Sequence, residues 1–139
     1  VATDHAPHTV EEKALPYAKC PSGGPLIQHS LVAMLEMERD GIFTIAQVVE
    51  KLCHAPARLF GVDRRGYIRE GFHADMVLVD RAKQWTVEKR NLLYKCGWSP
   101  FEGQRFTSAV QRTWVNGVSV FADGLVDPRV RGQRLLFTR

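Results

Sequence analysis

An aspartate and two histidines lie close together at the start of the chain, in the stretch Asp4-His5-Ala6-Pro7-His8. A carboxylate can bind a metal ion or accept a proton, and a histidine can hold an anionic substrate. The short apolar lead-in before Asp4 is typical of a strand that ends in a polar loop, which is where (β/α)-barrel enzymes place catalytic groups. The stretch is a candidate active site; the alternative is that Asp4 caps a turn and the histidines are solvated.

A polar loop is predicted over residues 9–25, and it contains Ser22, Gly23 and Gly24. Glycine has no side chain and tolerates unusual dihedral angles, so its backbone can approach a ligand closely. A glycine pair is more often a simple turn. The residues alone therefore leave both interpretations open.

The order of motifs along the chain resembles that of the dihydroorotases, which are zinc amidohydrolases of pyrimidine synthesis. Because the matching segments cover nearly the whole chain in order, the resemblance is more specific than any single motif. It favours functional roles for Asp4 and His8. The matching segments are residues 4–8, 11–13, 19–24, 71–80, 95–103 and 113–117.

The resemblance implies a role for each site residue in the reversible cyclisation of N-carbamoyl-L-aspartate to L-dihydroorotate. The site would hold one or two zinc ions, and Asp4 would be a ligand to zinc. Asp4 would also accept a proton from the attacking hydroxide and deliver it to the leaving nitrogen. His8 would bind the substrate carboxylate through a charge-assisted hydrogen bond. The Ser22–Gly23 backbone would hold the amide edge of the ring. His5 matches no known role and is not assigned to the metal.

The composition is that of an ordinary globular protein, with 139 residues of which 45% are hydrophobic and 24% charged. No apolar run approaches membrane-spanning length, and the first residues lack the layout of a signal peptide. The basic residues behind the net charge of +4 are scattered, which favours a solvated surface over nucleic-acid binding. Cys20, Cys53 and Cys96 fit neither a disulfide framework nor a Cys-x-x-Cys zinc site, so we expect reduced thiols in a cytoplasmic protein.

Helices are predicted in the first half of the chain. Apolar spacing predicts a helix over residues 26–40, in which His29 is expected to be packed or solvated. Thr44, with a glutamine three residues later, is typical of a capping box that begins a second helix. Pro56 predicts the start of a short third helix that ends at Gly61. We expect these helices to pack against the end of a barrel.

Short strands separated by turns are predicted after residue 62. Asn116-Gly117 is the strongest short signal for a hairpin. Aromatic residues in the irregular loop over residues 90–106 are expected to anchor that loop to the body: Trp98, Phe101 and Phe106. The predicted strands are 66–71, 76–79, 84–87, 112–115 and 118–121, with a last strand or a surface tail over 131–137.

These predictions give an α/β fold class with two parts. Residues 1–61 are expected to be the C-terminal part of an amidohydrolase (β/α)8 barrel, its last strand and helices. Residues 62–139 are expected to be the C-terminal part of a small β-sandwich followed by a tail. Short strands separated by turns are typical of such a sandwich.

The chain is too short for a complete enzyme of this kind. A (β/α)8 barrel takes roughly 250 residues, and the chain supplies one barrel strand. The resemblance implies further metal ligands that this sequence does not contain: a His-x-His pair, a carboxylated lysine and two other histidines. His54 and His73 have no recognisable ligand spacing. We therefore expect the C-terminal third of a longer enzyme, inactive alone, with the remaining zinc ligands outside this sequence.

Several alternatives stay open. Allantoinase and dihydropyrimidinase use the same scaffold on other cyclic amides, although His8 favours a substrate that carries a carboxylate. The chain could also belong to a non-catalytic dihydroorotase-like partner of aspartate transcarbamoylase, or be a free-standing interaction module. The expected partner is the small-molecule substrate, dihydroorotate or N-carbamoyl-L-aspartate, without nucleic acid or membrane. A homo-oligomer and association with aspartate transcarbamoylase are both compatible with the sequence.

Overall fold

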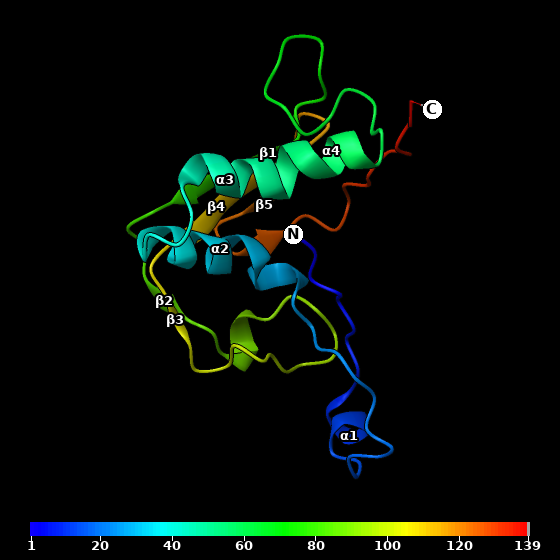
Figure 1. The fold of residues 1–139 in the computed structure, drawn as a ribbon, viewed down its shortest axis with the longest axis vertical. Helices are drawn as coiled ribbons and strands as arrows, with labels where there is room; N and C mark the ends of the chain where they lie inside the picture. The colour runs from blue at the N-terminus through cyan, green and yellow to red at the C-terminus, as the bar shows by residue number, and fades with distance from the viewer. Residues whose placement is uncertain (139) are drawn as a thin grey trace.

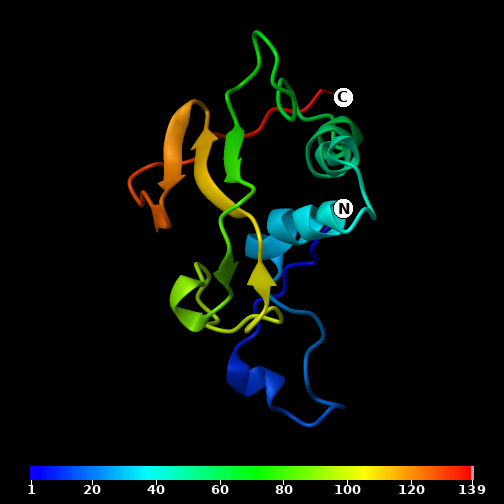
Figure 2. The same cartoon turned by 90° about the vertical axis from the view of Figure 1, so that its left-hand side faces the viewer.

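A computed structural model describes residues 1–138 of the chain. Its helices form one layer and a four-stranded antiparallel sheet forms a second layer beside them (Figures 1 and 2). A short helix, α1 (Val10–Lys13), and a loop around residue 70 project from opposite ends of this body (Figure 1). The chain therefore has a mixed α/β structure, as the sequence predicts.

The first predicted helix is confirmed. A single 3-10 turn, η1 (Ile27–His29), leads directly into α2 (Ser30–Arg39). The next helix, α3 (Ile45–Val49), begins at the predicted capping box. The Gln47 backbone N–H donates to the Thr44 hydroxyl at 3.2 Å, and the Thr44 backbone N–H donates to the side-chain oxygen Oε1 of Gln47 at 2.8 Å.

The third predicted helix is present close to its predicted bounds, but it is continuous with the second. A π-helical segment, η2 (Glu50–His54), joins α3 to α4 (Ala55–Leu59) without a break. The Ala55 N–H donates to the Glu50 carbonyl, five residues back. Proline has no N–H and its ring clashes with a carbonyl in a regular helix, so the wider turn just before Pro56 lets the helix continue. It ends before Gly61, which has a φ of +60°.

The predicted hairpin is confirmed within the main sheet. Strand β4 (Ala109–Val115) pairs with β5 (Val118–Ala122), and the turn between them has positive φ at both Asn116 and Gly117. Such a turn matches the twist of the strands that it joins. The sheet is completed by β1 (Met76–Asp80), which pairs with β4, and β6 (Leu125–Val126), which pairs with β5.

Other strand predictions were less accurate. Residues 66–71 form no strand, because glycines with φ of +80° and +78° bound this loop and it pairs with no neighbour. The strand expected over 84–87 is shorter, β2 (Trp85–Thr86), and pairs with the unpredicted β3 (Arg105–Phe106). A further 3-10 turn, η3 (Lys89–Asn91), follows β2.

Two apolar clusters hold the layers together. In one, Val79 of β1 packs against Met34, Leu35 and Val48, which joins the sheet to α2 and α3. The other contains Val32, Val87 and Phe106, with Phe101 packed against it. The expectation that the aromatic residues anchor the loop over 90–106 is confirmed for Phe101 and Phe106.

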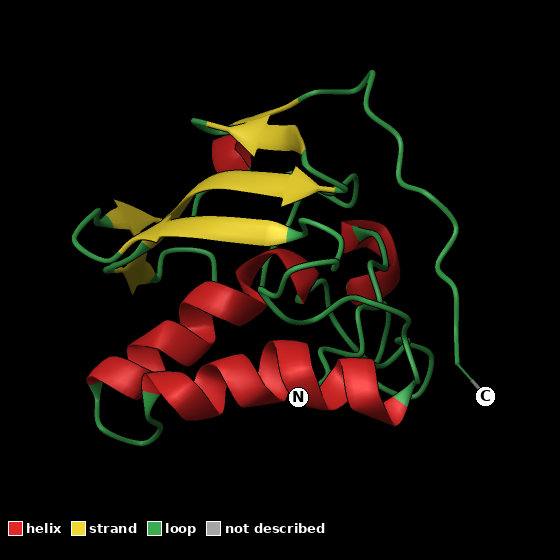
Figure 3. Cartoon of the chain, turned by 90° about the horizontal axis from the view of Figure 1, so that it is seen from above, coloured by secondary structure: helices red, strands yellow, loops and turns green. Residues whose placement is uncertain are grey.

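The C-terminal segment runs along the outside of the molecule as a tail (Figure 3). It touches the end of the helical region through an isolated bridge between Val62 and Phe137. The Asp63 N–H donates to the Leu136 carbonyl at 2.8 Å, and the Thr138 N–H donates to the Gly61 carbonyl at 2.7 Å. Nothing among the helices of residues 1–138 has the length and apolar character needed to cross a membrane.

Candidate active site around Asp4 and His8

The segment that carries Asp4 and His8 is held by a single bridge. His5 pairs with Gly24 in parallel, and the Ala6 N–H donates to the Gly24 carbonyl at 3.0 Å. The strand expected at residues 1–4 is not formed, because a parallel strand needs neighbours on its edges and the described residues provide only this bridge. The segment therefore lies beside the 21–24 loop without belonging to a sheet.

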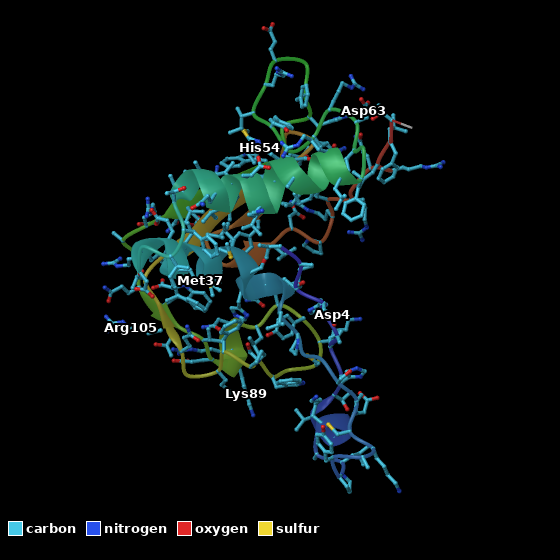
Figure 4. All side chains as sticks on the ribbon, viewed as in Figure 1. Asp4, Met37, His54, Asp63, Lys89 and Arg105 are labelled. Carbon is cyan, nitrogen blue, oxygen red and sulfur yellow. The ribbon has the colours of Figure 1, made fainter. Side chains whose placement is uncertain are left out.

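Asp4 is exposed and has a φ of +46°. This left-handed conformation is uncommon for residues with a side chain, and aspartate tolerates it better than most. Figure 4 shows Asp4 on the segment that leads from the body toward α1. Its carboxylate is open to solvent and to any group that packs against this side of the chain.

A capped helical turn follows His8 directly. The Thr9 hydroxyl accepts from the Glu12 N–H at 3.3 Å, and Glu12 Oε2 accepts from the Thr9 N–H at 2.7 Å. This capping box begins α1. A loop without a helix was predicted over residues 9–25, although the sequence contains the Thr-x-x-Glu pattern of a capping box. His8 is half-buried, and its Nδ1 lies 3.6 Å from Glu12 Oε2. That distance allows an ion pair when the imidazole is protonated.

The structure brings the Ser22–Gly23 backbone next to this segment. The Lys13 ammonium donates to the Pro21 carbonyl at 2.7 Å and to the Gly23 carbonyl at 3.2 Å. Gly23 has a φ of +89°, and a Cβ there would lie only 2.7 Å from the Cβ of Ala6. Glycine is thus required at this close approach. Sequence reasoning gave Lys13 no role, although a basic residue in the last turn of a short helix is a local signal for bonds to carbonyls.

A third segment reaches the site from a distant part of the sequence. The Trp98 indole N–H donates to the His8 carbonyl at 2.7 Å. The two residues are 90 positions apart, and nothing in the sequence around Trp98 points to His8. The predicted anchoring of Trp98 is confirmed, but its partner could not be foreseen.

The other nearby histidines are engaged in packing. His5 Nδ1 accepts from the Ile27 N–H at 3.4 Å. His29 is fully buried, as expected of a packed histidine, against the rings of Trp85 and Phe106, each with its centroid 6.0 Å away. Burial lowers the pKa of the His29 imidazole. It is therefore neutral at physiological pH.

The described residues do not form a zinc site by themselves. Residues 1–138 contain no group of three or more histidine, cysteine or acidic side chains placed to hold a metal ion. His54 and Asp63 lie far from Asp4 (Figure 4). Zinc takes three or four protein ligands, so the described residues do not supply a complete set of ligands.

A small apolar hollow of about 150 Å³ lies behind the segment that carries Asp4. Residues 1–3 line one side of it, and Met34 and Met37 of α2 are among the residues that line the rest. It contains no acidic, basic or imidazole side chain. The side chains that line the hollow are therefore mostly apolar.

The chain belongs to the amidohydrolase family, because the family's sequence model matches residues 1–120. It is similar to the dihydroorotase of Pyrococcus furiosus, with 33% identity over 136 residues, which are 98% of this chain and 32% of that protein. It is also similar to the dihydroorotase of Clostridium acetobutylicum, with 38% identity over 88% of this chain and 29% of that protein. The chain thus spans about a third of the length of these relatives.

Solved structures of the family have the same fold. The dihydropyrimidinase from Brevibacillus agri matches with a TM-score of 0.84 and 29% sequence identity, over 88% of this chain and 28% of that one. The L-hydantoinase from Arthrobacter aurescens matches with a TM-score of 0.76 and 30% sequence identity, over 85% of this chain and 27% of that one. The mixed α/β arrangement described above is therefore an amidohydrolase-type fold.

Proposed function

We propose that the chain is the C-terminal part of a zinc-dependent dihydroorotase, which interconverts N-carbamoyl-L-aspartate and L-dihydroorotate in de novo pyrimidine synthesis in the cytoplasm. In this proposal residues 1–61 complete a (β/α)8 barrel and residues 62–139 contribute to a flanking β-sandwich. The observation that carries the proposal is that the loop with Ser22 and Gly23 lies against the segment that bears Asp4 and His8, in a chain that is 33–38% identical to dihydroorotases.

Each residue has a task in the hydrolytic direction. Water attacks the cyclic amide carbon, and a carboxylate oxygen of Asp4 takes the proton that the water loses. The bond between this carbon and the ring nitrogen breaks, and Asp4 returns the proton to that nitrogen, which gives N-carbamoyl-L-aspartate. Zinc, when bound through Asp4 and ligands from outside this chain, polarises the carbonyl and acidifies water.

Two groups would hold the substrate. His8 would bind the carboxylate that dihydroorotate carries, because a protonated imidazole forms strong charge-assisted hydrogen bonds with anions. The backbone of Ser22 and Gly23 would hold the amide edge of the ring. Since Gly23 lies against Ala6, two residues before His8, both contacts would converge on one small ligand.

A second candidate is a hydantoinase or dihydropyrimidinase activity. The fold similarity to the dihydropyrimidinase from Brevibacillus agri supports it, with a TM-score of 0.84. Dihydrouracil and hydantoin carry no carboxylate for His8 to bind. The substrate carboxylate therefore separates the two candidates.

The test is a comparison of substrates with the longer enzyme of which we propose that this chain is a part. We expect hydrolysis of dihydroorotate to exceed that of dihydrouracil, hydantoin and allantoin, and His8→Ala to raise the KM for dihydroorotate. A preference for dihydrouracil or hydantoin would support the second candidate. A full-length protein that binds no zinc and turns over none of these substrates would indicate a non-catalytic partner, for which aspartate transcarbamoylase is the first candidate to test.

A further inference from the structure

The loop that carries Trp98 is rigidly attached to the helical layer. The Gln28 side chain donates to the Asn91 carbonyl at 2.8 Å and accepts from the Leu93 N–H at 2.8 Å. Farther along the loop, Phe101 packs against the buried Phe106. Residues on both sides of Trp98 are thus attached to the body of the molecule. The indole is therefore held in place beside the segments that it contacts.

Trp98 contacts both parts of the candidate site. Its indole N–H bonds to the His8 carbonyl at 2.7 Å. The far edge of its ring, at Cη2, lies 3.5 Å from where a Cβ on Gly24 would be. Gly24 in turn accepts the hydrogen bond from Ala6. The indole therefore lies against the two segments that the proposed substrate would bridge.

The side chain of His8 has weak support of its own. Its nearest charged partner among the described residues is Glu12 Oε2 at 3.6 Å, which is longer than a hydrogen bond. The backbone is better held, because the His8 N–H donates to the Ala6 carbonyl at 2.9 Å and the His8 carbonyl accepts from Trp98. The point from which the imidazole projects is therefore held by the backbone at His8, and the Trp98 hydrogen bond fixes the peptide plane on one side of it.

We propose that Trp98 is a positioning residue, whose indole N–H orients the His8 imidazole toward the carboxylate of the substrate. This proposal rests on the proposed function, in which His8 binds that carboxylate. A hydrogen bond between a loop and the backbone of a binding residue improves affinity by reducing the freedom that is lost when the ligand binds. The reacting atoms are not touched, so the effect falls on binding.

The test uses the longer enzyme with Trp98→Phe, and with Trp114→Phe as the matched control, because Trp114 lies on β4 beside Arg112 and away from the site. We expect Trp98→Phe to raise the KM for dihydroorotate about three- to tenfold, the size of one lost hydrogen bond, with kcat within about twofold of wild type. In a His8→Ala background the same substitution should add nothing. An equal loss in both backgrounds, or equal effects of Trp98→Phe and Trp114→Phe, would overturn the proposal.

A second variant separates the hydrogen bond from the packing. Replacement of Trp98 by benzothienylalanine keeps the bicyclic shape and removes only the N–H, so it should reproduce the KM increase in a protein with wild-type thermal stability. If that variant has a wild-type KM, the hydrogen bond does not position His8.

A spectroscopic measurement tests the positioning even if the enzyme does not act on dihydroorotate. In the NMR spectrum, the His8 ring C–H signal should move in Trp98→Phe and stay in place in Trp114→Phe. An unmoved His8 signal would overturn the positioning role, whereas a moved signal in a protein without dihydroorotase activity would overturn only the proposed function.

Discussion

Glu36 on α2 accepts two hydrogen bonds from Thr107, a residue 71 positions away in the sequence that lies just before β4. The Thr107 N–H donates to Glu36 Oε1 at 2.6 Å, and the Thr107 hydroxyl donates to the same oxygen at 2.8 Å. Both residues are partly buried. This pair links the helical layer to the chain just before β4 and complements the two apolar clusters.

Loss of the Glu36 carboxylate should destabilise the protein. Glu36→Ala removes the shared acceptor of both hydrogen bonds and leaves the partly buried Thr107 N–H unpaired, so we expect the free energy of unfolding to fall by about 1–3 kcal/mol. Glu36→Gln keeps an acceptor oxygen and should cost less. Urea unfolding measures both, and Glu70→Ala, at an exposed loop position, is the control. Equal stability of Glu36→Ala and Glu70→Ala would contradict the expectation.

Asp75 should make the protein sensitive to acid. Burial alone would raise the pKa of its carboxyl, but the hydrogen bond from the Asn116 N–H and the Arg65 guanidinium outweigh burial and lower that pKa. A carboxyl with a lower pKa in the folded state binds fewer protons there than in the unfolded state. Its stabilisation is therefore present above the ordinary pKa and is lost as the pH falls through the folded-state value.

Urea midpoints at pH 7 and at pH 3 measure this effect. We expect a smaller difference between the two pH values in Asp75→Asn than in wild type, because asparagine does not titrate. A difference that is unchanged in Asp75→Asn would assign the acid sensitivity to other groups.

His29 should add a second pH dependence in a different range. Burial lowers the pKa of this imidazole in the folded state, so the unfolded chain binds the proton more readily. Stability should hold above the ordinary histidine pKa of about 6.5 and fall below it, by at most about 1.4 kcal/mol per pH unit for one proton.

His29→Leu should flatten the stability profile between pH 7.5 and pH 5.5. Phe101→Leu perturbs the same aromatic cluster without removing a titrating group, so it should lower stability and keep the wild-type slope. If the two variants have the same slope, His29 is not the group responsible.

Asp4→Asn should abolish dihydroorotate hydrolysis by the longer enzyme. Asparagine is also tolerant of the left-handed conformation at this position, so the backbone is retained while the proton acceptor is lost. The expected loss in kcat is about 10²–10⁴-fold or more. Asp40→Asn, at the exposed end of α2, should leave the steady-state rate unchanged. Near-normal turnover by Asp4→Asn would remove Asp4 from the mechanism.

Gly23→Ala should weaken substrate binding beyond its effect on stability. A side chain here meets both a positive φ and the Cβ of Ala6, so the loop must move away from the site. Gly71 is the matched control, because it has a φ of +78° with nothing within 4 Å of the added Cβ. Both variants should lose about 1–2 kcal/mol of stability. Only Gly23→Ala should raise the KM for dihydroorotate. Equal KM values in Gly23→Ala and Gly71→Ala would argue against contact between the substrate and the loop that contains Gly23.

Local signals in the sequence were sufficient for several elements. The Asn116-Gly117 turn and the capping box at Thr44 depend on side chains a few positions apart, and both were predicted correctly. The strand expected before Asp4 did not form, because a strand depends on partners that its own residues do not specify. The absence of a strand over 66–71 has the same physical reason.

Residue types and resemblance supplied the candidate site residues Asp4, His8 and the Ser22–Gly23 backbone, but not the contacts around them. Lys13 was given no role, and Trp98 was expected to anchor its loop without any indication that its partner is the His8 carbonyl. A contact across 90 residues depends on the whole fold, and the sequence beside Trp98 carries no sign of it.

The π-helical turn closed by the Ala55 N–H to Glu50 carbonyl hydrogen bond changes the direction in which α4, at the end of the continuous helix 45–59, faces. Val48 and Ala57 are both buried, with 1% and 9% exposure, and they are nine positions apart. At about 100° per residue, a regular helix would point them in opposite directions, roughly 180° apart. The π turn accommodates one extra residue, which reduces the angle between the two side chains about the helix axis by about 100°. They therefore point in directions only about 80° apart. Deletion of one residue from this turn would therefore rotate Ala57 out of its contact with Gly66 and turn an apolar face of α4 in a new direction.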